Sequence, residues 1–476
     1  VHEFTKVEMF MVTTPELSDQ ALEEIRSWEE ERFKSLGLHF QVLDMPPHEL
    51  GAQAYRKYDI EAWMPGRKVY GEISSCSNCT DYQSRSIENN ILHRKGVGNI
   101  KLVHELKRKL EQADTHTSEY KDIRKQYYKE LSLIPNNTHP DIFKYGDKPK
   151  EIKVVKDKKL FTFKCKEFSE ITKRLNLVRT EQLGNVAGNR SYYIVGDLAE
   201  LEQALVDYFI NQLITSNYEI VSVPDILPRD IIESCGMNTR GERTQVSDLS
   251  YYGLCGRHPS DLCLSGTSEM ALAGYFAGET LSEEDLPKKV AAVSRCYRAE
   301  TSSVAEERGI FRVHEFTKVE MFMVTTPELS DQALEEIRSW EEERFKSLGL
   351  HFQVLDMPPH ELGAQAYRKY DIEAWMPGRK VYGEISSCSN CTDYQSRRLD
   401  IKYKTRNGSV KFAHTLNGTA CALPRLLITL IENGQDEKGS VHIPEVLQKY
   451  MKNRASIFRQ KSIPELRLVK NKKQQN

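Results

Sequence analysis

Hydrophobic positions between residues 86 and 134 recur at helical spacing. The apolar residues that form two successive series are Ile100, Val103, Leu106 and Leu110, then Ile123 and Tyr127. Intervals of three or four place apolar side chains on one face of a helix, so we predict an amphipathic helix pair that ends before Pro135. The Lys and Arg residues here leave two interpretations open: a solvated hairpin packed on the rest of the chain, or an arm that contacts nucleic acid.

From about residue 150, short strand patterns alternate with amphipathic helices. A helix is predicted over Leu198–Ile214, and the strand-like run EIVSVPDIL follows it with Pro224 inside. Because proline has no N–H to donate, a strand that contains it is predicted at a sheet edge. Further strands are predicted from VAAVSRCYRAE, FRVHEFTKVEMFMVT, HFQVLDM, KVYGEISS and KFAHTLNG. Long strands with interspersed helices predict an α+β domain, residues 135–451, with an antiparallel sheet flanked by helices.

One segment of the chain occurs twice. Residues 1–85 are identical at every position to residues 313–397. Solenoid repeats are excluded, because they are shorter, diverge in sequence and need several units to bury a core. A recent duplication of coding sequence and a misjoined sequence are the two main interpretations, and a second functional domain is a third. Strands without their sheet neighbours are exposed edges, so we expect the copy to pack poorly or to be absent from the mature protein.

The composition of the chain excludes only a few classes of protein. The 476 residues are 39% hydrophobic and 29% charged, with a net charge of −2. No apolar run approaches the roughly 18 residues of a membrane-spanning helix, so we expect no membrane partner. Ten scattered cysteines form no disulfide framework, which favours a reducing compartment. Residues 452–476 are rich in Lys and Arg, which is typical of a disordered basic tail, with phosphate contact as the alternative.

The run FRVHEFTKVE carries the most informative chemistry. Arg312, Phe316 and Glu320 occupy every fourth position, so in a strand they share one face. A cation, an aromatic ring and a carboxylate in this order would receive a phosphate, a purine ring and an ammonium group. Upstream, RCYRAE places Arg298 and Glu300 on one face of another strand, and the polar loop TSSVAEERG follows.

These two strands resemble the second signature motif of class II aminoacyl-tRNA synthetases, in which Arg-x-Glu, a loop and F-x-x-x-E follow one another. The amphipathic helix and the Pro224 strand resemble the first motif, which in that class forms the dimer interface. GTACALPRLLITLIEN resembles the third: Pro424 suits the first turn of a helix, and Arg425 lies at its positive N-terminus. The resemblance implies the class II synthetase fold, preceded here by a short helical arm.

Further runs are similar to one family within that class, the seryl-tRNA synthetases. They are GTSE at 266–269, GEISSCSNCTDYQSRR at 383–398 and HTLNGTACALPR at 414–425. The resemblance extends from about Leu133 to Met451, and ESCGM, LAGYFAG and AYRKYDIEAWMPGR are most similar to the animal mitochondrial form. It implies a ligase that activates serine with ATP and Mg²⁺ to seryl-adenylate, releases pyrophosphate and transfers the seryl group to tRNA(Ser). It also implies a homodimer in the mitochondrial matrix.

The resemblance implies a role for each matching residue. Serine would be bound by Thr267, Ser268, Glu269, Arg298, Glu320, Asn417 and Thr419. ATP would be bound by Arg298, Ala299, Glu300, Arg312, Val313, Phe316, Glu384, Ile385, Ser386, Ser387 and Arg425. Mg²⁺ would be held by Glu384 and Ser387, and the catalytic residues would be Arg298, Glu320 and Arg425. The copy at 1–85 has no equivalents of Arg298, Thr267, Glu269 and Arg425, so we expect no second active site there.

The resemblance leaves alternatives open. A synthetase-like paralogue can keep the fold and act as a noncatalytic RNA-binding or assembly protein. Cys388 and Cys391 form a CxxC, repeated as Cys76 and Cys79, which permits a zinc site, although the second pair only copies the first. The arm at 86–134 is short for this family and is interpreted as a truncated tRNA-binding arm. The N-terminal stretch is rich in Glu and shows no Arg- and Ser-rich leader, so the mitochondrial location rests on the resemblance.

Overall fold

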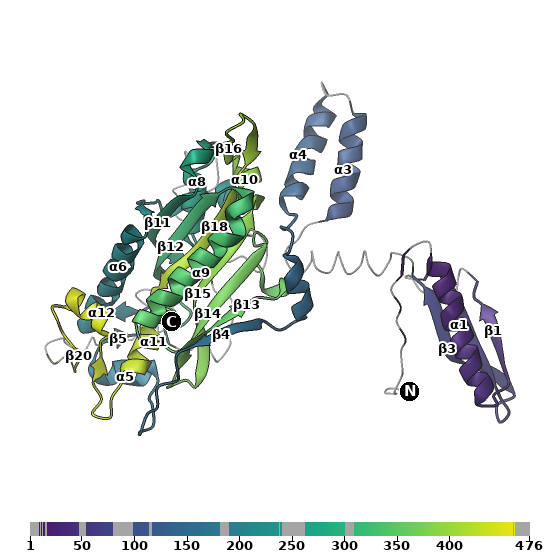
Figure 1. Ribbon diagram of the computed structural model, residues 1–476, viewed down its shortest axis with the longest axis horizontal. Helices are drawn as coiled ribbons and strands as arrows, with labels where there is room; N and C mark the ends of the chain where they lie inside the picture. Colours follow the sequence, from purple (N-terminus) through teal and green to yellow (C-terminus); the bar gives the residue numbers. More distant parts are fainter. Residues whose placement is uncertain are drawn as a thin grey trace, which may run out of the picture. The chain divides into compact units, whose positions relative to one another are not determined.

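The computed structural model describes residues 9, 11, 13–14, 17–46, 54–79, 99–113, 117–180, 190–237, 239, 262–299, 309–459 and 461 (Figure 1). The chain divides into two compact units, Val1–Arg94 and Lys95–Asn476. The first contains the copy at 1–85, and the second contains the helical arm and a large sheet. Within the described ranges, every helix is too short or too polar to span a membrane.

The first unit is a helix packed on a three-stranded antiparallel sheet. Its elements are α1 (Ser18–Ser35), β1 (Phe40–Asp44), β2 (Arg56–Met64) and β3 (Val69–Asn78), with the strand order β1-β2-β3. Leu22, Tyr58 and Cys76 form a small buried core where α1 meets the sheet. The segment therefore packs better than its missing sheet neighbours led us to expect, because its own helix covers one face. Large apolar side chains still remain exposed, including Trp28 at 47% and Leu36 at 69%.

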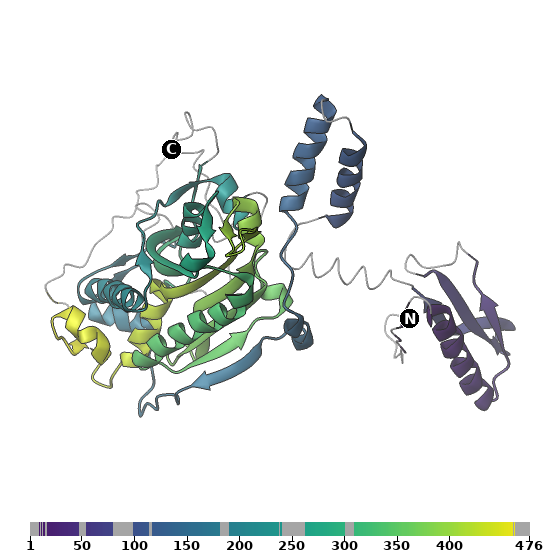
Figure 2. The same cartoon turned by 45° about the horizontal axis from the view of Figure 1, so that its top comes forward.

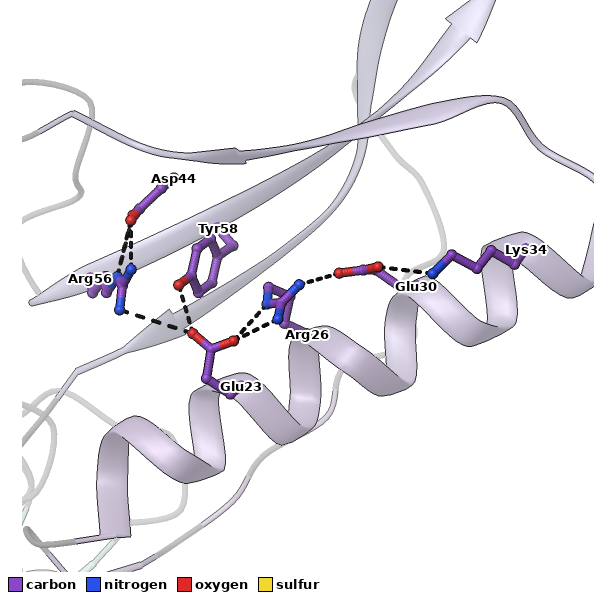
Figure 3. Close-up of polar contacts among 7 residues, drawn as sticks. All are labelled: Glu23, Arg26, Glu30, Lys34, Asp44, Arg56 and Tyr58. Atoms are coloured by element: carbon purple, nitrogen blue, oxygen red, sulfur yellow. Dashed lines mark hydrogen bonds and ion pairs between the residues drawn. The ribbon is translucent and has the colours of Figure 1, made fainter.

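Polar contacts tie α1 to its sheet (Figure 3). The Tyr58 hydroxyl donates to Glu23 at 2.6 Å, and Arg26 binds both Glu23 and Glu30. Lys34 binds the other oxygen of Glu30 at 3.1 Å. These contacts join residues of the same 85-residue segment, so the sequence of that segment is sufficient to specify them.

The second copy repeats this network inside a larger structure. Tyr370 donates to Glu335 at 2.7 Å, and Arg338 binds Glu335 and Glu342. Where Glu30 binds Lys34, Glu342 pairs with Lys153 on a neighbouring strand. The local contacts are therefore preserved, and the surroundings decide which further partners a side chain finds.

The helical arm consists of α3 (Ile100–Gln112) and α4 (Ser118–Ser132), which lie side by side. Asn99 and Thr117 cap their N-termini by accepting from backbone N–H groups at 3.1 Å. Val103 and Leu106 are buried. The predicted helix pair is confirmed for these residues, whereas residues 86–98 lie outside the described part of the chain.

The second unit is built on an eight-stranded sheet with the order β4-β13-β14-β15-β18-β12-β11-β7. Its strands are β4 (Lys150–Val155), β7 (Glu219–Ile220), β11 (Lys288–Tyr297), β12 (Glu315–Thr325), β13 (Phe352–Asp356), β14 (Arg368–Met376), β15 (Val381–Thr392) and β18 (His414–Ala422). Neighbours pair antiparallel except β11 and β7, which pair parallel. The predicted α+β fold with a mainly antiparallel sheet is confirmed.

Three helices cover one face of this sheet: α6 (Asp197–Thr215), α9 (Ser330–Ser347) and α11 (Leu423–Gly434). Figures 1 and 2 show α9 lying across β15 and β18. Gly418 on β18 permits this close approach, because a Cβ there would lie only 2.4 Å from Cγ2 of Ile337. The main hydrophobic core lies between these helices and the sheet.

Short helices pack against the opposite face, over β11, β12 and β18. They are α8 (Ser268–Tyr275) and α10 (Tyr394–Leu399), and α7 (Arg229–Ser234) packs on both of these helices. Phe276, just after α8, stacks on Phe322 of β12 with ring centroids 6.2 Å apart. Because strand side chains alternate, Phe322 and Glu320 share this face. The face beneath α8 is therefore the one on which the predicted site residues of β12 lie.

Three details differ from the sequence prediction. Pro224 lies between β7 and β8 (Ile226–Pro228) instead of inside a strand, because its missing N–H cannot continue the ladder, although β7 does lie at the sheet edge. β12 begins at Glu315, so Arg312 precedes the strand. β11 ends at Tyr297, so Arg298 follows it, and Glu300 lies outside the described residues.

The first part of the predicted basic tail belongs to the fold. β20 (Ser456–Ile457) pairs with β19 (Val441–His442), and Ile457 is fully buried. Residues 460 and 462–476 lie outside the described part of the chain. The remaining described α-helices and β-strands are α5 (Phe168–Leu175), β5 (Val178–Arg179), β6 (Tyr193–Ile194), β9 (Leu262–Leu264), β10 (Thr280–Ser282), β16 (Lys402–Lys404), β17 (Val410–Phe412) and α12 (Glu445–Gln448).

Candidate functional site

Two adjacent strands bring Glu320 and Thr419 together. In the β12–β18 register these residues are direct partners, and the Thr419 hydroxyl lies 3.4 Å from Oε2 of Glu320. Lys318, two positions earlier on the same face, places its Nζ 2.5 Å from that oxygen. Glu320 is almost fully buried, and burial raises the pKa of its carboxyl while Lys318 opposes the rise. The strands thus create a buried carboxylate with one cation and one hydroxyl against it.

A second buried carboxyl, Glu269, lies in the first turn of α8. Thr267 caps this helix, its hydroxyl accepting from the Glu269 N–H at 3.3 Å, and Ser268 between them is 1% exposed. Burial and the neighbouring Glu320 raise the pKa of Glu269 to about 7. Asn417, two positions before Thr419 on β18, shares its strand face and is also buried. The predicted serine-binding residues of α8, β12 and β18 therefore converge.

Arg298 lies beside Phe316 at the open ends of β11 and β12. Its guanidinium carbon is 5.3 Å from the centroid of the Phe316 ring. The Arg298 N–H donates to the His314 carbonyl at 2.8 Å, and His314 Nδ1 is 2.9 Å from the Arg298 carbonyl oxygen. These bonds fix the backbone on both sides of the connecting loop. Among the described residues, no group bonds the buried Nε of Arg298, so the cation retains donor capacity for an anion.

Arg425 and Glu384 form an ion pair at the N-terminus of α11. Arg425 Nη1 lies 3.1 Å from Oε2 of Glu384, and its guanidinium carbon is 4.7 Å from the Phe311 ring centroid. Burial alone would raise the pKa of Glu384, but Arg425 and Lys369 outweigh it and lower the pKa to about 2. Pro424 lies in the first helical turn as predicted. Glu384 is therefore a permanent anion at neutral pH.

A β-bulge explains how Glu384 and Ser387 share one face although they are three positions apart. Glu384 pairs with Glu373, whereas Ser387 pairs with Asp371, so β15 has one residue more than β14 across this interval. Ile385 is consequently turned into the main core, and the Ser386 hydroxyl donates to the Thr419 carbonyl at 2.6 Å. Only the main chains of Ile385 and Ser386 would therefore be available to the predicted ligand.

Comparison with known proteins identifies the class to which this fold belongs. The family model for the tRNA synthetase class II core domain (G, H, P, S and T) matches residues 1–110 and 252–434. The mitochondrial serine–tRNA ligase of Mus musculus is 45% identical over 333 residues, 69% of this chain and 63% of that protein. The serine–tRNA ligase of Treponema denticola is 40% identical over 350 residues, 72% of this chain and 80% of that protein.

The chain belongs to the serine–tRNA ligase family. Two solved structures agree: seryl-tRNA synthetase from Pyrococcus horikoshii complexed with ATP, and cytoplasmic serine–tRNA ligase from Naegleria fowleri in complex with AMP. The first has a TM-score of 0.66 and 26% identity, covering 80% of this chain and 94% of that one. The second has a TM-score of 0.65 and 29% identity, covering 79% and 90%. The chain spans 63% of the length of the mouse and bovine mitochondrial relatives.

Three residues of the candidate site escaped the sequence prediction. Lys318 had a usable signal, because residues 316, 318 and 320 share a strand face by period two. Phe311 and Gln395 had none. Phe311 stacks on Arg425, which lies far along the chain, and Gln395 bonds Glu269, 126 positions away. Contacts between residues so distant in sequence leave no local periodicity to read.

Three further residues that were predicted to bind ATP lie just outside the strands β11 and β12. Val313 is buried in the main core, so only its main chain is suited to contact a ligand. Ala299 is half-buried directly after Arg298. Arg312 is half-buried in the turn before β12.

The CxxC pair is part of the sheet. Cys388 and Cys391 are both fully buried in β15, and the Asn417 amide lies 3.6 Å from Sγ of Cys391. Within the ranges that the structure describes, no three His, Cys, Asp or Glu residues gather as a metal site. For Mg²⁺, Glu384 and Ser387 would offer two hard oxygen donors, of which the carboxylate is ionised and partly exposed. These two donors fit a cation that takes its other ligands from a substrate and water.

Proposed function

We propose that the protein is a serine–tRNA ligase that forms seryl-adenylate from serine and ATP and transfers the seryl group to tRNA(Ser). The observation that supports this most strongly is the convergence of a buried polar cluster, a cation beside an aromatic ring and an Arg–Glu pair on one face of the sheet. Those three groups match the three parts of the substrates, which are serine, adenosine and the phosphates.

Serine would bind between Glu269 and Glu320. Two carboxylates would receive its ammonium group, and Asn417 and Thr419 would line the space around its hydroxyl, with Thr267 and Ser268 at the helix end. These side chains are buried, so an alanine in place of serine would leave their polar atoms without a partner. Arg298 would bind the serine carboxylate from the adjacent strand end.

ATP would bind along the line from Phe316 to Arg425. Phe316 would stack on adenine, with the main chains of Val313 and Ala299 at the base edge and Arg312 and Glu300 near the phosphates. Arg298 would contact the α-phosphate and the serine carboxylate together, which orients the attack and neutralises developing charge. Arg425 would bind the pyrophosphate end, while Mg²⁺ on Glu384 and Ser387 would supply further charge neutralisation.

The macromolecular partners are proposals of the same kind. The basic helices α3 and α4 would contact tRNA(Ser) through its phosphates. A homodimer would form through α6 and the edge strand β7, which present the first class II motif. The mitochondrial matrix is proposed because the mouse, bovine and Saccharomyces cerevisiae relatives are named mitochondrial.

A pyrophosphate-exchange assay tests the proposed catalytic activity directly. Purified protein with serine, ATP and Mg²⁺ should incorporate labelled pyrophosphate into ATP, and omission of serine should stop the exchange. Replacement of serine by alanine should reduce it strongly, for the reason given above. If the folded protein catalyses no exchange, the result favours a noncatalytic paralogue. Binding of tRNA by that inactive protein would support this alternative.

The KM for serine should fall as the pH rises through about 7. Glu269 has a pKa of about 7 in the folded protein, and only its ionised form attracts the serine ammonium. Between pH 6 and pH 8 the ionised fraction grows about tenfold, so the KM should fall by a similar factor. The raised pKa also means that the free energy of unfolding decreases as the pH rises from about 4.5 to about 7, because the folded state binds the proton more tightly than the unfolded state. Glu269→Gln should flatten both profiles; a Glu269→Gln profile that matched the wild type would assign them to another group.

A further inference from the structure

The buried side-chain amide of Gln395, on α10, bridges α8 and β18 behind the proposed serine site. Its Nε2 donates to Oε1 of Glu269 at 2.7 Å, and its Oε1 accepts from the Thr415 hydroxyl at 2.8 Å. Gln395 and Thr415 are both fully buried. Neither residue touches a proposed ligand, and no role has been assigned to them so far.

The chemistry of the three groups fixes the direction of this bridge. An ionised carboxylate only accepts hydrogen bonds, so the amide NH₂ of Gln395 must face Glu269. Its carbonyl oxygen then faces Thr415, whose hydroxyl must donate. Among the described residues, none donates a hydrogen bond to Oε2 of Glu269, so Gln395 holds one carboxylate oxygen and the second is left for a ligand.

We propose that Gln395 is a positioning residue that holds the Glu269 carboxylate toward the serine ammonium. The proposal rests on the proposed function. It adds an assignment within it: α10 contacts no substrate but orients the serine half of the site, through one amide anchored on β18. Because ATP would bind at the Phe316 and Arg425 end, the effect of losing this anchor should fall on serine and leave ATP unaffected.

Two substitutions separate positioning from packing. Gln395→Leu keeps the volume but leaves Glu269 and Thr415 without their partner, and the KM for serine should rise roughly 10- to 100-fold while the KM for ATP stays within about twofold. Gln395→Glu keeps the shape and places a second carboxyl against Glu269. Below about pH 7 the two carboxyls share a proton and the bridge persists, whereas at higher pH they repel.

The sign of the pH dependence is the decisive readout. The wild-type KM for serine should fall from pH 6.5 to pH 8, whereas that of Gln395→Glu should rise roughly tenfold, since the second ionisation breaks the bridge. A purely structural role would lower the melting temperature without reversing this trend. Gln83 is the matched control, because the run TDYQSR contains both Gln83 and Gln395. Gln83→Leu and Gln83→Glu should leave both KM values unchanged.

The outcomes distinguish this inference from the proposed function. If the wild type exchanges pyrophosphate but Gln395→Glu keeps the wild-type pH trend, or Gln395→Leu raises both KM values equally, the positioning role is overturned. If the wild type does not exchange, the proposed function fails, and calorimetric titration of the same variants with serine then tests the positioning role alone. A chain that binds no serine contradicts both.

Discussion

Arg298→Ala should lower kcat/KM for serine-dependent pyrophosphate exchange about a thousandfold. The guanidinium lies 5.3 Å from the Phe316 ring, and the backbone of Arg298 is fixed by its two bonds with His314. A cation held in place before the substrate arrives needs no reorganisation when charge develops, so its removal acts on the transition state. Arg298→Lys should recover only part of the rate, because an ammonium cannot bridge a carboxylate and a phosphate with a planar fork.

Arg295 provides the control for this prediction. It lies on β11 three positions earlier and is bound to Glu315 and Thr317 on the strand surface. Arg295→Ala removes an equal charge from the same strand without removing a proposed ligand contact, so kcat/KM should change by no more than a few fold. Equal losses from the two substitutions would mean that the positive charge near the strand end acts through the general field, against the specific role of Arg298.

Much of the fold was accessible from sequence because its signals are local. Apolar periodicity predicted α6 within one residue at each end, and Pro424 marked the first turn of α11. The alternation of FTKVE placed Phe316 and Glu320 on one face of β12, as observed. Each of these predictions depends on residues within one or two turns or a single strand, where intrinsic geometry dominates.

The site was less accessible because its geometry depends on irregularities and distant contacts. Period two would place Glu384 on the same face as Ser386, and the bulge in β15 replaces Ser386 with Ser387. The family resemblance named Ser387, but no pattern in the strand could explain it. Gln395 was missed for a related reason: its partner Glu269 comes from a different helix, and the tertiary fold alone brings the two together.

The duplicated segment shows that local sequence alone does not determine how deeply a side chain is buried. Trp28 and Trp340 occupy the same position in identical 85-residue sequences, yet Trp28 is 47% exposed and Trp340 is 9% exposed. Each stacks on the arginine four positions later, Arg32 at 4.9 Å and Arg344 at 5.4 Å. Both copies therefore share the local contact with arginine. They differ in burial, because burial depends on the neighbouring elements that pack against each tryptophan.

This difference predicts that one substitution made at two identical positions will have unequal costs. Trp340 donates to the Ser216 hydroxyl at 2.8 Å and packs on Phe209 of α6 with ring centroids 6.2 Å apart. Trp340→Ala should therefore lower the free energy of unfolding of the second unit by about 3–5 kcal/mol, through lost burial and the cavity left behind. Trp28→Ala removes a largely exposed ring and should cost its own unit less than about 1 kcal/mol.

Urea unfolding followed by hydrogen exchange of the α6 peptide measures the first value, since α6 occurs once in the chain and the two copies give identical peptides. Trp28→Ala should leave α6 protection unchanged. Because helix propensity, neighbours in sequence and the arginine contact are the same at both positions, they cancel, and the difference between the two costs isolates the contribution of tertiary burial. Equal costs would contradict the burial assigned to Trp340 and would mean that the segment's own residues determine its stability.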